Sequence, residues 1–336
     1  MTFDLEQCVR KNIKNLKPYS SARSEFAGAA EVFLDANENA FGSPAGVGYN
    51  RYPDPLQTEL KQRIATIKGV DPSQIFVGNG SDEAIDLLFR IFCEPGRDET
   101  IICPPTYAMY RVSADINDIA VREIRLREEF QLNVPAIISG VTEQTKLIFI
   151  CSPNNPTGNL MRRESVIDIA SGFGGIVVVD EAYIDFAAES SMIAELSRMP
   201  NLIVLQTFSK AWGMAGLRVG MAFAGAEIIV LMNCVKPPYN VSGIAQRAVI
   251  DALSDQESVE QWIEMALQQR AMLAESLGRL KFVETVYPSD ANFILVRVAN
   301  ADAVYSFLLE ERVVVRNRSN VEPCGGCLRI TVGTIE

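Results

Sequence analysis

The segment from Val177 to Gly220 decides the fold expected for this chain, because it holds two apolar runs that each end in polar residues. The first run, Val177-Val178-Val179, stops at Asp180. The second run, Leu202 to Leu205, is followed after a short polar edge by Lys210. Short β-branched runs of this kind are typical of buried parallel strands. Open α/β sheets bind ligands at the carboxyl ends of their strands, so the sequence predicts a ligand site near these charges.

Three charged side chains in this segment suit one kind of chemistry. Lys210 lies among small residues and two aromatics, so partial desolvation is expected to lower its pKa and favour a Schiff base. Arg218 offers a guanidinium fork for a phosphate. With Asp180 as the acid for a pyridinium nitrogen, the set matches the protein's half of a pyridoxal-phosphate site. The competing interpretation is a loop lysine beside a Gly-rich turn, with Asp180 as a helix cap.

The composition is that of a globular chain with room for one large α/β domain and a smaller one: it has 336 residues, of which 48% are hydrophobic and 22% charged. The net charge of −11 argues against a nucleic-acid or anionic-membrane surface. No apolar run approaches the length of a membrane span, and the N-terminus lacks an apolar signal core. Any phosphate-bearing ligand must therefore meet a local positive site.

Cysteine and histidine usage narrows the chemistry. Seven scattered cysteines suggest reduced thiols in a cytoplasm, and the absence of histidine excludes Ser-His-Asp and Cys-His catalysis. The run Cys324-Gly325-Gly326-Cys327 has redox or zinc spacing, but no second close cysteine pair accompanies it. A Gly-Gly turn is the favoured interpretation, and no metal site is expected.

Strands and helices alternate from about residue 74 to residue 235, which predicts a mainly parallel sheet with helices on both faces. Within this part, Gly78 to Glu83 forms a Gly-rich turn into a helix, with Ser81 as the expected N-cap. Its backbone N–H groups suit a phosphate, although a plain capped helix is the alternative. Tyr107 suits stacking on a planar ring, but an isolated tyrosine is more often core or rim. Asn154 is a candidate donor to a ring hydroxyl, and an Asx-Pro turn is its alternative.

The last third of the chain predicts a long helix over about residues 243–279 and then a small α+β domain. Its expected strands are Phe282-Val283, Asn292 to Val296, Val313 to Val315 and Leu328 to Val332. Arg316 and Arg329 lie at or in these strands, where an unpaired arginine is costly. The residues alone leave open whether the partner is an acidic side chain or an anionic substrate.

The segment around Lys210 resembles the fold-type I aminotransferases, in which Ser-Lys is followed by Gly-Leu-Arg-x-Gly. The resemblance covers nearly the whole chain and is strongest to the histidinol-phosphate aminotransferase subfamily. Its motifs occur here in order: Leu34 to Asn39, Tyr52 to Pro55, Gly80 to Glu83, Pro105 to Tyr107, Ser152 to Gly158, Val179 to Tyr183, Ser209 to Gly220, Lys236 to Asn240 and Leu328 to Gly333. The resemblance implies an aspartate aminotransferase-like α/β fold with a seven-stranded type of sheet.

The resemblance also implies a role for each site residue, with pyridoxal 5'-phosphate as the cofactor. Lys210 holds the cofactor and moves the proton, and Asp180 pairs with the ring nitrogen. The other cofactor contacts are Asn154 and Tyr183 at the ring hydroxyl, Tyr107 on the ring, and Ser209, Arg218, Gly80, Ser81 and Asp82 at the phosphate. Tyr52 is expected to reach the cofactor phosphate of a neighbouring subunit, so a homodimer is implied. Arg329 is expected at the substrate carboxylate, with Arg316, Tyr19, Tyr239 and Asn37 as further substrate contacts.

The implied reaction transfers an amino group between L-histidinol phosphate and 2-oxoglutarate in histidine biosynthesis. An arginine fork accepts carboxylate or phosphate oxygens alike, so one anion site can serve both substrates. The alternatives are an aromatic-amino-acid aminotransferase, a threonine-phosphate decarboxylase on the same scaffold, and a catalytically idle regulator. The expected division is a large domain over residues 34–242, with residues 1–33 and 243–336 forming the arm and the smaller domain.

Two features depart from the subfamily pattern. Ala40 stands where proline is usual, so a changed loop is expected there. The sequence stops at Glu336, where relatives usually continue into a terminal helix, which suggests a shortened chain.

Overall fold

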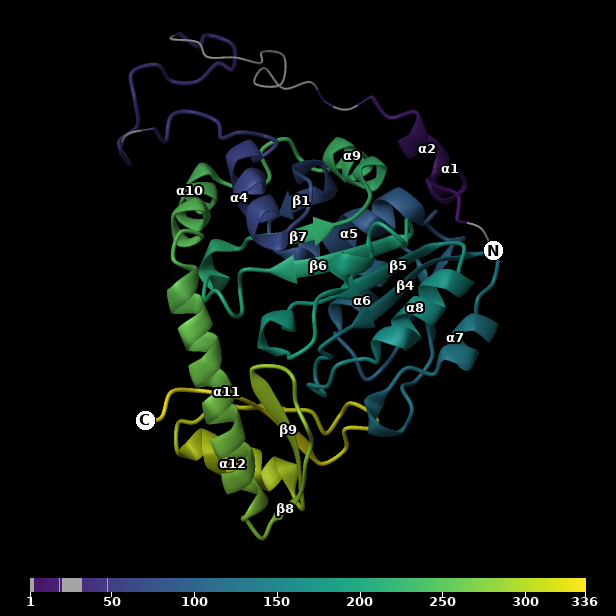
Figure 1. Cartoon of the computed structure of the whole chain (residues 1–336), viewed down its shortest axis with the longest axis vertical. Helices are drawn as coiled ribbons and strands as arrows, with labels where there is room; N and C mark the ends of the chain where they lie inside the picture. Colours follow the sequence, from purple (N-terminus) through teal and green to yellow (C-terminus); the bar gives the residue numbers. More distant parts are fainter. Residues whose placement is uncertain (1–2, 18, 20–31, 47) are drawn as a thin grey trace.

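The computed structural model describes residues 3–17, 19, 32–46 and 48–336. In this described part, a seven-stranded sheet lies between helices, and a smaller four-stranded sheet lies at one end of the molecule (Figure 1). The strands of the large sheet are β1 (Ile75–Gly78), β2 (Glu99–Ile102), β3 (Ala120–Glu123), β4 (Thr145–Cys151), β5 (Ile176–Asp180), β6 (Leu202–Thr207) and β7 (Gly220–Phe223). Their order is β1-β7-β6-β5-β4-β2-β3, and only β7 runs antiparallel to its neighbours. The prediction of a mainly parallel sheet is confirmed.

Helices cover both faces of the large sheet. One face packs against α4 (Thr58–Lys68), α7 (Val134–Ser139), α8 (Arg163–Gly172) and α10 (Gly243–Ala252), and the other against α5 (Ser81–Phe92), α6 (Met109–Ile116) and α9 (Ala226–Val235). Along β5, Val177 and Val179 face the first layer while Ile176 and Val178 face the second. Burying each such side chain contributes roughly 1.5–3 kcal/mol. This two-sided burial explains why the strand sequence is apolar without interruption.

The parallel strands bring their polar ends to a single edge. Cys151 pairs with Asp180 in the β4–β5 ladder, and Asp180 pairs with Leu205 in the β5–β6 ladder. Short 3-10 turns follow or precede the strands: η1 (Pro72–Gln74), η2 (Glu128–Phe130), η3 (Ile184–Phe186), η4 (Met192–Glu195) and η5 (Ala215–Leu217). The carboxyl edge of β4, β5 and β6 therefore carries Asp180 and the loop with Lys210.

The small sheet is antiparallel, with strand order β10-β11-β9-β8. Its strands are β8 (Val283–Val286), β9 (Phe293–Val298), β10 (Arg316–Asn317) and β11 (Cys327–Thr331), and α11 (Gln256–Gly278) and α12 (Ala301–Glu310) pack on one face. Figure 1 shows α11 running from the large layer to this small sheet. The small α+β unit agrees with the prediction.

In this last third, the predicted helical stretch is confirmed but consists of two helices, and one predicted strand was wrong. The helix expected over residues 243–279 is divided into α10 and α11, because Asp255 ends the connection by accepting the Ser258 N–H at 3.3 Å as an N-cap. The strand expected at Val313 to Val315 lies outside the sheet: only Arg316–Asn317 pairs there, and Val314 is 78% exposed. The apolar β-branched run therefore predicted a longer edge strand than the structure contains.

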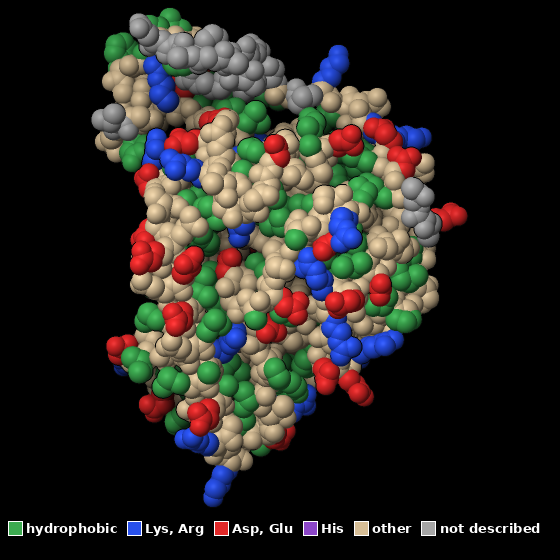
Figure 2. Space-filling model, viewed as in Figure 1, with side chains coloured by type: hydrophobic (Ala, Val, Ile, Leu, Met, Phe, Trp, Pro, Cys, Tyr) green, Lys and Arg blue, Asp and Glu red, His purple; other side chains and the backbone are tan. Residues whose placement is uncertain are grey.

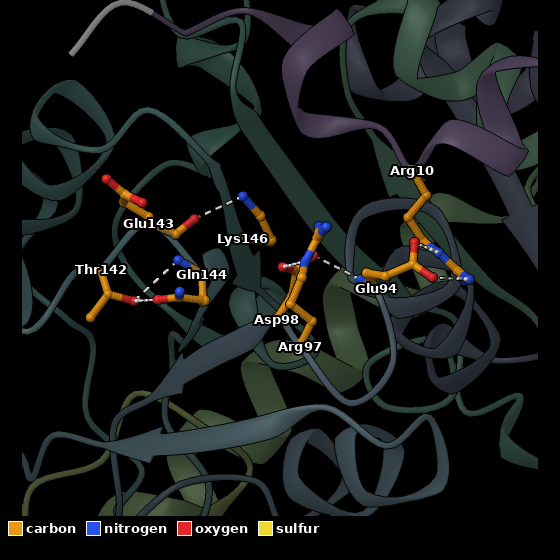
Figure 3. Close-up of polar contacts among 8 residues, drawn as sticks. All are labelled: Arg10, Glu94, Arg97, Asp98, Thr142, Glu143, Gln144 and Lys146. Atoms are coloured by element: carbon orange, nitrogen blue, oxygen red, sulfur yellow. Dashed lines mark hydrogen bonds and ion pairs between the residues drawn. The ribbon is translucent and has the colours of Figure 1, made fainter.

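The N-terminal arm contacts the large layer. Its helices α1 (Leu5–Cys8) and α2 (Lys11–Lys14) lie against α5, and the Arg10 N–H donates to the Ile91 carbonyl at 3.0 Å. Figure 3 shows the Arg10 guanidinium on Glu94, next to Asp98, whose carboxylate accepts the Glu94 N–H at 2.8 Å. The described residues 3–17 of the arm therefore lie against the large layer. Helix α10 also packs in the core of that layer.

The surface carries charges of both signs. In the face shown in Figure 2, acidic and basic side chains are interspersed over the described residues. Among those residues, no helix is long and apolar enough to cross a membrane.

Candidate active site

A cavity of about 220 Å³ opens at the carboxyl edge of the large sheet. Its lining combines four loops and one helix N-terminus: Gly80, Ser81, Asp82, Tyr107, Asn155, Asp180, Ala182, Tyr183, Thr207, Ser209, Lys210, Ala215 and Arg218. The structure therefore brings together most of the residues that the sequence predicted as cofactor contacts. Residues more than a hundred positions apart in the sequence meet here, because the strands of the parallel sheet end side by side.

Asp180 is the buried acid of this cavity. It is 2% exposed, and desolvation raises the pKa of its carboxyl from 3.8 to about 6. The Tyr110 hydroxyl donates to its Oδ2 at 2.8 Å, and the Ala182 N–H donates to its Oδ1 at 3.1 Å. Both hydrogen bonds favour the carboxylate and oppose the effect of burial. Asp180 is thus held in one orientation, and burial has a larger effect on its pKa than the two hydrogen bonds that oppose it.

Tyr110 is a site residue that the sequence analysis did not single out. Its side chain is fully buried and stacks on Phe149 with ring centroids 4.8 Å apart. Desolvation and the Asp180 charge raise the pKa of its hydroxyl, so it acts as a hydrogen-bond donor. In the sequence, only its closeness to Tyr107 could have suggested a role for Tyr110. The sequence does not show which of these two tyrosines faces the buried Asp180.

Lys210 lies at the cavity wall beside the aromatic ring of Tyr183. Its Nζ lies 5.5 Å from the Tyr183 ring centroid. Desolvation, with the neighbouring Arg329 charge, lowers the pKa of this ammonium, and Asp180 acts in the opposite direction. The lowered pKa agrees with the expectation from sequence and increases the fraction of neutral, nucleophilic amine.

The opposite wall is a cradle built from backbone. Helix α5 begins at Ser81 with Gly80 as N-cap, and no side chain caps it. A Cβ on Gly220 would lie 2.2 Å from the Ser81 nitrogen, and Gly80 has φ +81°, so both positions require glycine. Helix N-termini attract anions through their N–H groups and dipole. The expected role of Ser81 as the N-cap was wrong, because it is the first helical residue.

Arg218 completes this cradle. Its backbone has φ +56°, a strained conformation for a side chain other than glycine, and its Nη2 lies 4.0 Å from the Asp82 carboxylate. On the same side, the Thr207 hydroxyl donates to the Ser209 Oγ at 3.0 Å and accepts the Ser209 N–H at 3.1 Å. Thr207 lines the cavity and was also missed by the sequence analysis. The cradle offers a guanidinium, two hydroxyls and a helix N-terminus, which suit a phosphate.

Asn154 does not occupy the place predicted for it. It is fully buried, and its Nδ2 donates to the Pro105 carbonyl at 2.8 Å and to the Thr157 Oγ1 at 2.7 Å. Its Oδ1 accepts from the Thr106 hydroxyl at 3.1 Å. Because one amide proton is used within the turn and the other on the loop that follows β2, Asn154 has no free donor for a ring hydroxyl. The structure therefore places Asn154 outside the lining of the cavity, with its amide engaged in hydrogen bonds within the protein.

Asn155 is the asparagine that lines the cavity. Its Oδ1 accepts a hydrogen bond from the Arg329 Nη1 at 2.6 Å. Two consecutive asparagines point in different directions from one tight turn, so residue type alone could not decide between them. Asn155 therefore joins the wall of the cavity to the small sheet.

Two tyrosines complete the cavity wall. The Tyr107 hydroxyl donates to Asp82 at 3.1 Å, and its ring packs edge-on against Tyr110 with centroids 5.6 Å apart. The Tyr183 ring meets Phe293 of β9 edge-on at 5.1 Å. Burial raises the pKa of both hydroxyls, so each remains protonated at neutral pH. Both tyrosines lie where the sequence placed them, beside Asp180 and Lys210.

Arg329 and Arg316 face each other in the small sheet. They are directly opposite in the β10–β11 ladder, and the Arg329 guanidinium lies 5.2 Å from the Phe293 ring centroid. Desolvation lowers the pKa of Arg329. Within the described part of the chain, neither guanidinium lies within 4.0 Å of a carboxylate, so neither arginine forms a salt bridge there. Of the two partners left open by the sequence, an acidic side chain is therefore not found among the described residues.

The remaining predicted residues lie outside the small cavity. Tyr52 and Tyr239 stack with centroids 4.5 Å apart and, with Asn37, line a larger groove of about 1310 Å³ between the loop before α4 and helix α10. Tyr19 is 75% exposed. The structure thus separates Tyr52, Tyr239, Asn37 and Tyr19 from the side chains that surround Lys210.

The Cys324 to Cys327 segment forms the turn that the sequence favoured. The Cys327 N–H donates to the Cys324 carbonyl at 3.0 Å, and both thiols are buried beside Leu295. Among the described residues, no group of three or more metal-ligating side chains forms a metal site.

Comparison with known proteins identifies the family to which the chain belongs. The family model for aminotransferase class I and II matches residues 24–336, so the chain belongs to that family. It is 55% identical over 331 residues to the histidinol-phosphate aminotransferase of Parabacteroides distasonis, an alignment that covers 98% of this chain and 95% of the relative. At this identity and coverage, the chain falls within the histidinol-phosphate aminotransferase family.

Solved structures agree with this assignment. The histidinol-phosphate aminotransferase from Clostridium acetobutylicum is similar with a TM-score of 0.79 and 26% identity, covering 85% of this chain and 87% of that one. The enzyme from Sinorhizobium meliloti, solved in complex with pyridoxal-5'-phosphate, has the same fold, with a TM-score of 0.76 and 24% identity over 88% of this chain and 84% of that one.

Proposed function

We propose that this chain transfers an amino group between L-histidinol phosphate and 2-oxoglutarate, with pyridoxal 5'-phosphate as cofactor. The observation that carries the proposal is the convergence of Lys210, Asp180 and the uncapped N-terminus of α5 on one small cavity. When bound, the cofactor supplies an aldehyde and a ring that withdraws electrons from the substrate Cα. The family assignment supports the choice of substrates.

The residues present fit that cofactor. The Gly80 and Gly220 backbones leave room at the α5 N-terminus, and Arg218, Ser209 and Thr207 surround the same place. We assign the cofactor phosphate to this cradle. We assign Asp180 to the ring nitrogen, because a fixed carboxylate favours a proton there. Asn155 takes the role at the ring hydroxyl that Asn154 cannot fill, together with Tyr183.

Lys210 is the group that binds the cofactor aldehyde and later moves a proton. Its lowered pKa favours the neutral amine, which is the form needed for attack and for proton abstraction. Tyr107 covers the ring position from the α6 side, and its hydroxyl is fixed by Asp82. These contacts orient the reacting groups and limit access of water.

Arg329 is the substrate-anion residue that we place closest to the reacting centre. Its bond to Asn155 links the small sheet to the cavity wall. Arg316 lies opposite and adds a second positive charge. This pair of arginines can then accept a carboxylate of glutamate in one half-reaction and the phosphate of histidinol phosphate in the other.

We further propose that the enzyme works as a homodimer in the cytoplasm. Tyr52 is 52% exposed and lies in the groove beside α10 with Tyr239, away from Lys210 of its own chain. This arrangement supports a role for Tyr52 at the cofactor phosphate of a second copy, as the resemblance implies. Tyr19 and Asn37 are proposed to act from the same exposed side.

A substrate panel tests the proposed function. The reconstituted enzyme is assayed with 2-oxoglutarate and either histidinol phosphate or phenylalanine, and separately with threonine phosphate for release of carbon dioxide. The expected result is the highest kcat/KM with histidinol phosphate. Preferred turnover of phenylalanine would indicate an aromatic-amino-acid aminotransferase. Decarboxylation of threonine phosphate would indicate a threonine-phosphate decarboxylase.

A further inference from the structure

The small sheet has two different faces. Ile294, Val296, Leu328 and Ile330 pack against α11 and α12, whereas Leu295 and Cys327 lie on the opposite face with Phe130 of the large layer. Arg329 is paired with Leu295 in the β9–β11 ladder, so it belongs to the face that meets the large layer. This face also contains the link from Arg329 to Asn155.

Arg318 extends this face by a third guanidinium. Its N–H donates to the Cys327 carbonyl at 2.9 Å, which continues the β10–β11 pairing by one residue beyond Asn317. Alternate residues of a strand share a face, so Arg318 lies on the same side as Arg316. Three arginines, Arg316, Arg318 and Arg329, therefore project from one end of the small sheet; we refer to them as the arginine face.

Two groups on the arginine face are buried without an acceptor. The Nε atoms of Arg318 and Arg329 are both buried, and neither has a hydrogen-bond partner among the described residues. A buried donor without an acceptor is costly, and like charges directly across a ladder repel. Burial, together with repulsion from Arg329 and Arg316, also lowers the pKa of Arg318. A doubly charged anion placed against this face would remove both penalties.

A fourth arginine on this sheet face, Arg297, provides the contrast. The Arg297 Nε donates to the Tyr287 hydroxyl at 3.1 Å, and its Nη2 donates to the Pro323 carbonyl at 3.2 Å. Arg297 is therefore satisfied within the small unit. Arg318 has no such side-chain acceptor, and its charge acts on Tyr183 in the cavity wall.

We propose that Arg318 is a specificity-determining residue that binds the phosphate of the substrate, in addition to Arg316 and Arg329. This inference rests on the proposed function and names the substrate group that the third arginine recognises. A carboxylate has two oxygens and is satisfied by a single fork, whereas a phosphate monoester has three terminal oxygens and up to two charges. Arg318 therefore favours the phosphorylated substrate over glutamate.

The test compares two substrates in the holoenzyme. The value of kcat/KM is measured for histidinol phosphate and for glutamate in the wild type, Arg318→Gln, Arg318→Lys and Arg297→Gln. Loss of a charge-assisted hydrogen bond predicts that Arg318→Gln lowers kcat/KM about 10-fold to 100-fold for histidinol phosphate and less than about 3-fold for glutamate. Arg318→Lys keeps the charge without the fork and is expected to fall between the two. Arg297→Gln is the matched control and should keep the wild-type ratio.

Binding measurements separate this inference from the proposed function. Calorimetry of the holoenzyme with histidinol phosphate, histidinol and inorganic phosphate should show weaker binding of the two phosphate-bearing ligands in Arg318→Gln and equal binding of histidinol. Absence of wild-type turnover with histidinol phosphate would reject the proposed function, while inorganic phosphate would still decide the role of Arg318. Equal losses for both substrates, or no loss of phosphate binding, would overturn the inference. If Arg318→Gln does not fold, Arg318→Lys decides by the same criteria.

Discussion

The two sides of the candidate site are built differently. On the large sheet, Asp180 is buried and both of its carboxylate oxygens accept fixed hydrogen bonds. On the small sheet, Arg318 and Arg329 carry buried donors that no described residue accepts. The large sheet thus provides a preorganised cofactor wall, whereas the small sheet provides charges that an anionic substrate completes. A permanent cofactor calls for the first arrangement, and exchange of two different substrates calls for the second.

The largest effect is expected at the cofactor wall. Lys210→Ala removes the amine that binds the aldehyde and moves the proton, so kcat is expected to fall at least about 10³-fold. Steady-state assays with histidinol phosphate measure this loss, and the visible absorbance of the reconstituted protein should change with it. Lys146→Ala, which removes a lysine bonded to the Glu143 carbonyl on a distant edge, is the matched control. Activity of Lys210→Ala near the wild-type value would refute the assignment of this wall.

The pH dependence of stability tests whether burial raises the pKa of Asp180. The pKa of Asp180 rises from 3.8 to about 6 on folding, so its burial costs nothing below pH 3.8 and destabilises the protein as pH rises through 6. Without bound cofactor, Asp180→Asn is therefore expected to become more stable than the wild type above pH 6, by at most about 3 kcal/mol. Urea unfolding from pH 4 to pH 8 measures the difference.

Tyr110→Phe is the companion variant for this measurement. It removes a donor that favours the carboxylate, so the pKa of Asp180 should rise further and the loss of stability should extend to higher pH. Stability differences between Asp180→Asn and the wild type that do not vary with pH would contradict the raised pKa.

On the small sheet, Arg329→Gln is expected to affect both half-reactions. The variant removes the guanidinium that bonds Asn155, and kcat/KM should fall about 10²-fold for glutamate and for histidinol phosphate alike. The comparison with Arg318→Gln is decisive, because that variant is expected to act on one substrate only. A loss confined to a single substrate in Arg329→Gln would place this arginine outside the shared anion site.

The smallest effects distinguish the two neighbouring asparagines. Asn155→Ala should lower kcat/KM about 10-fold, because it loses one hydrogen bond at the cavity wall, and should leave the midpoint of thermal unfolding nearly unchanged. Asn154→Ala should instead cost about 1–3 kcal/mol of stability, since its three hydrogen bonds lie within the protein. Thermal melts and kinetics are measured for both variants. If Asn154→Ala lowered activity and Asn155→Ala lowered stability, the roles of the two asparagines would be reversed.

Local sequence determined the parts of this protein that depend on short-range chemistry. The apolar run before Asp180 can only be stable when buried on both faces, so it predicted a central strand and a carboxylate at its end. Gly80 and Gly220 permit a close approach of backbone that other residues would block. Lys210 and Arg218 lie near each other along the chain, and their order with Asp180 was enough to indicate a pyridoxal-phosphate site.

The tertiary structure decided what depends on direction and distant pairing. Residue types cannot show which of Asn154 and Asn155 faces the cavity, because the backbone of one turn sets both directions. Tyr110 in α6 meets Asp180 at the end of β5, seventy residues further along the chain, only through tertiary packing. Arg318 joins Arg316 and Arg329 through strand pairing, so its chemical role arises from the register of the small sheet and is invisible in a linear motif.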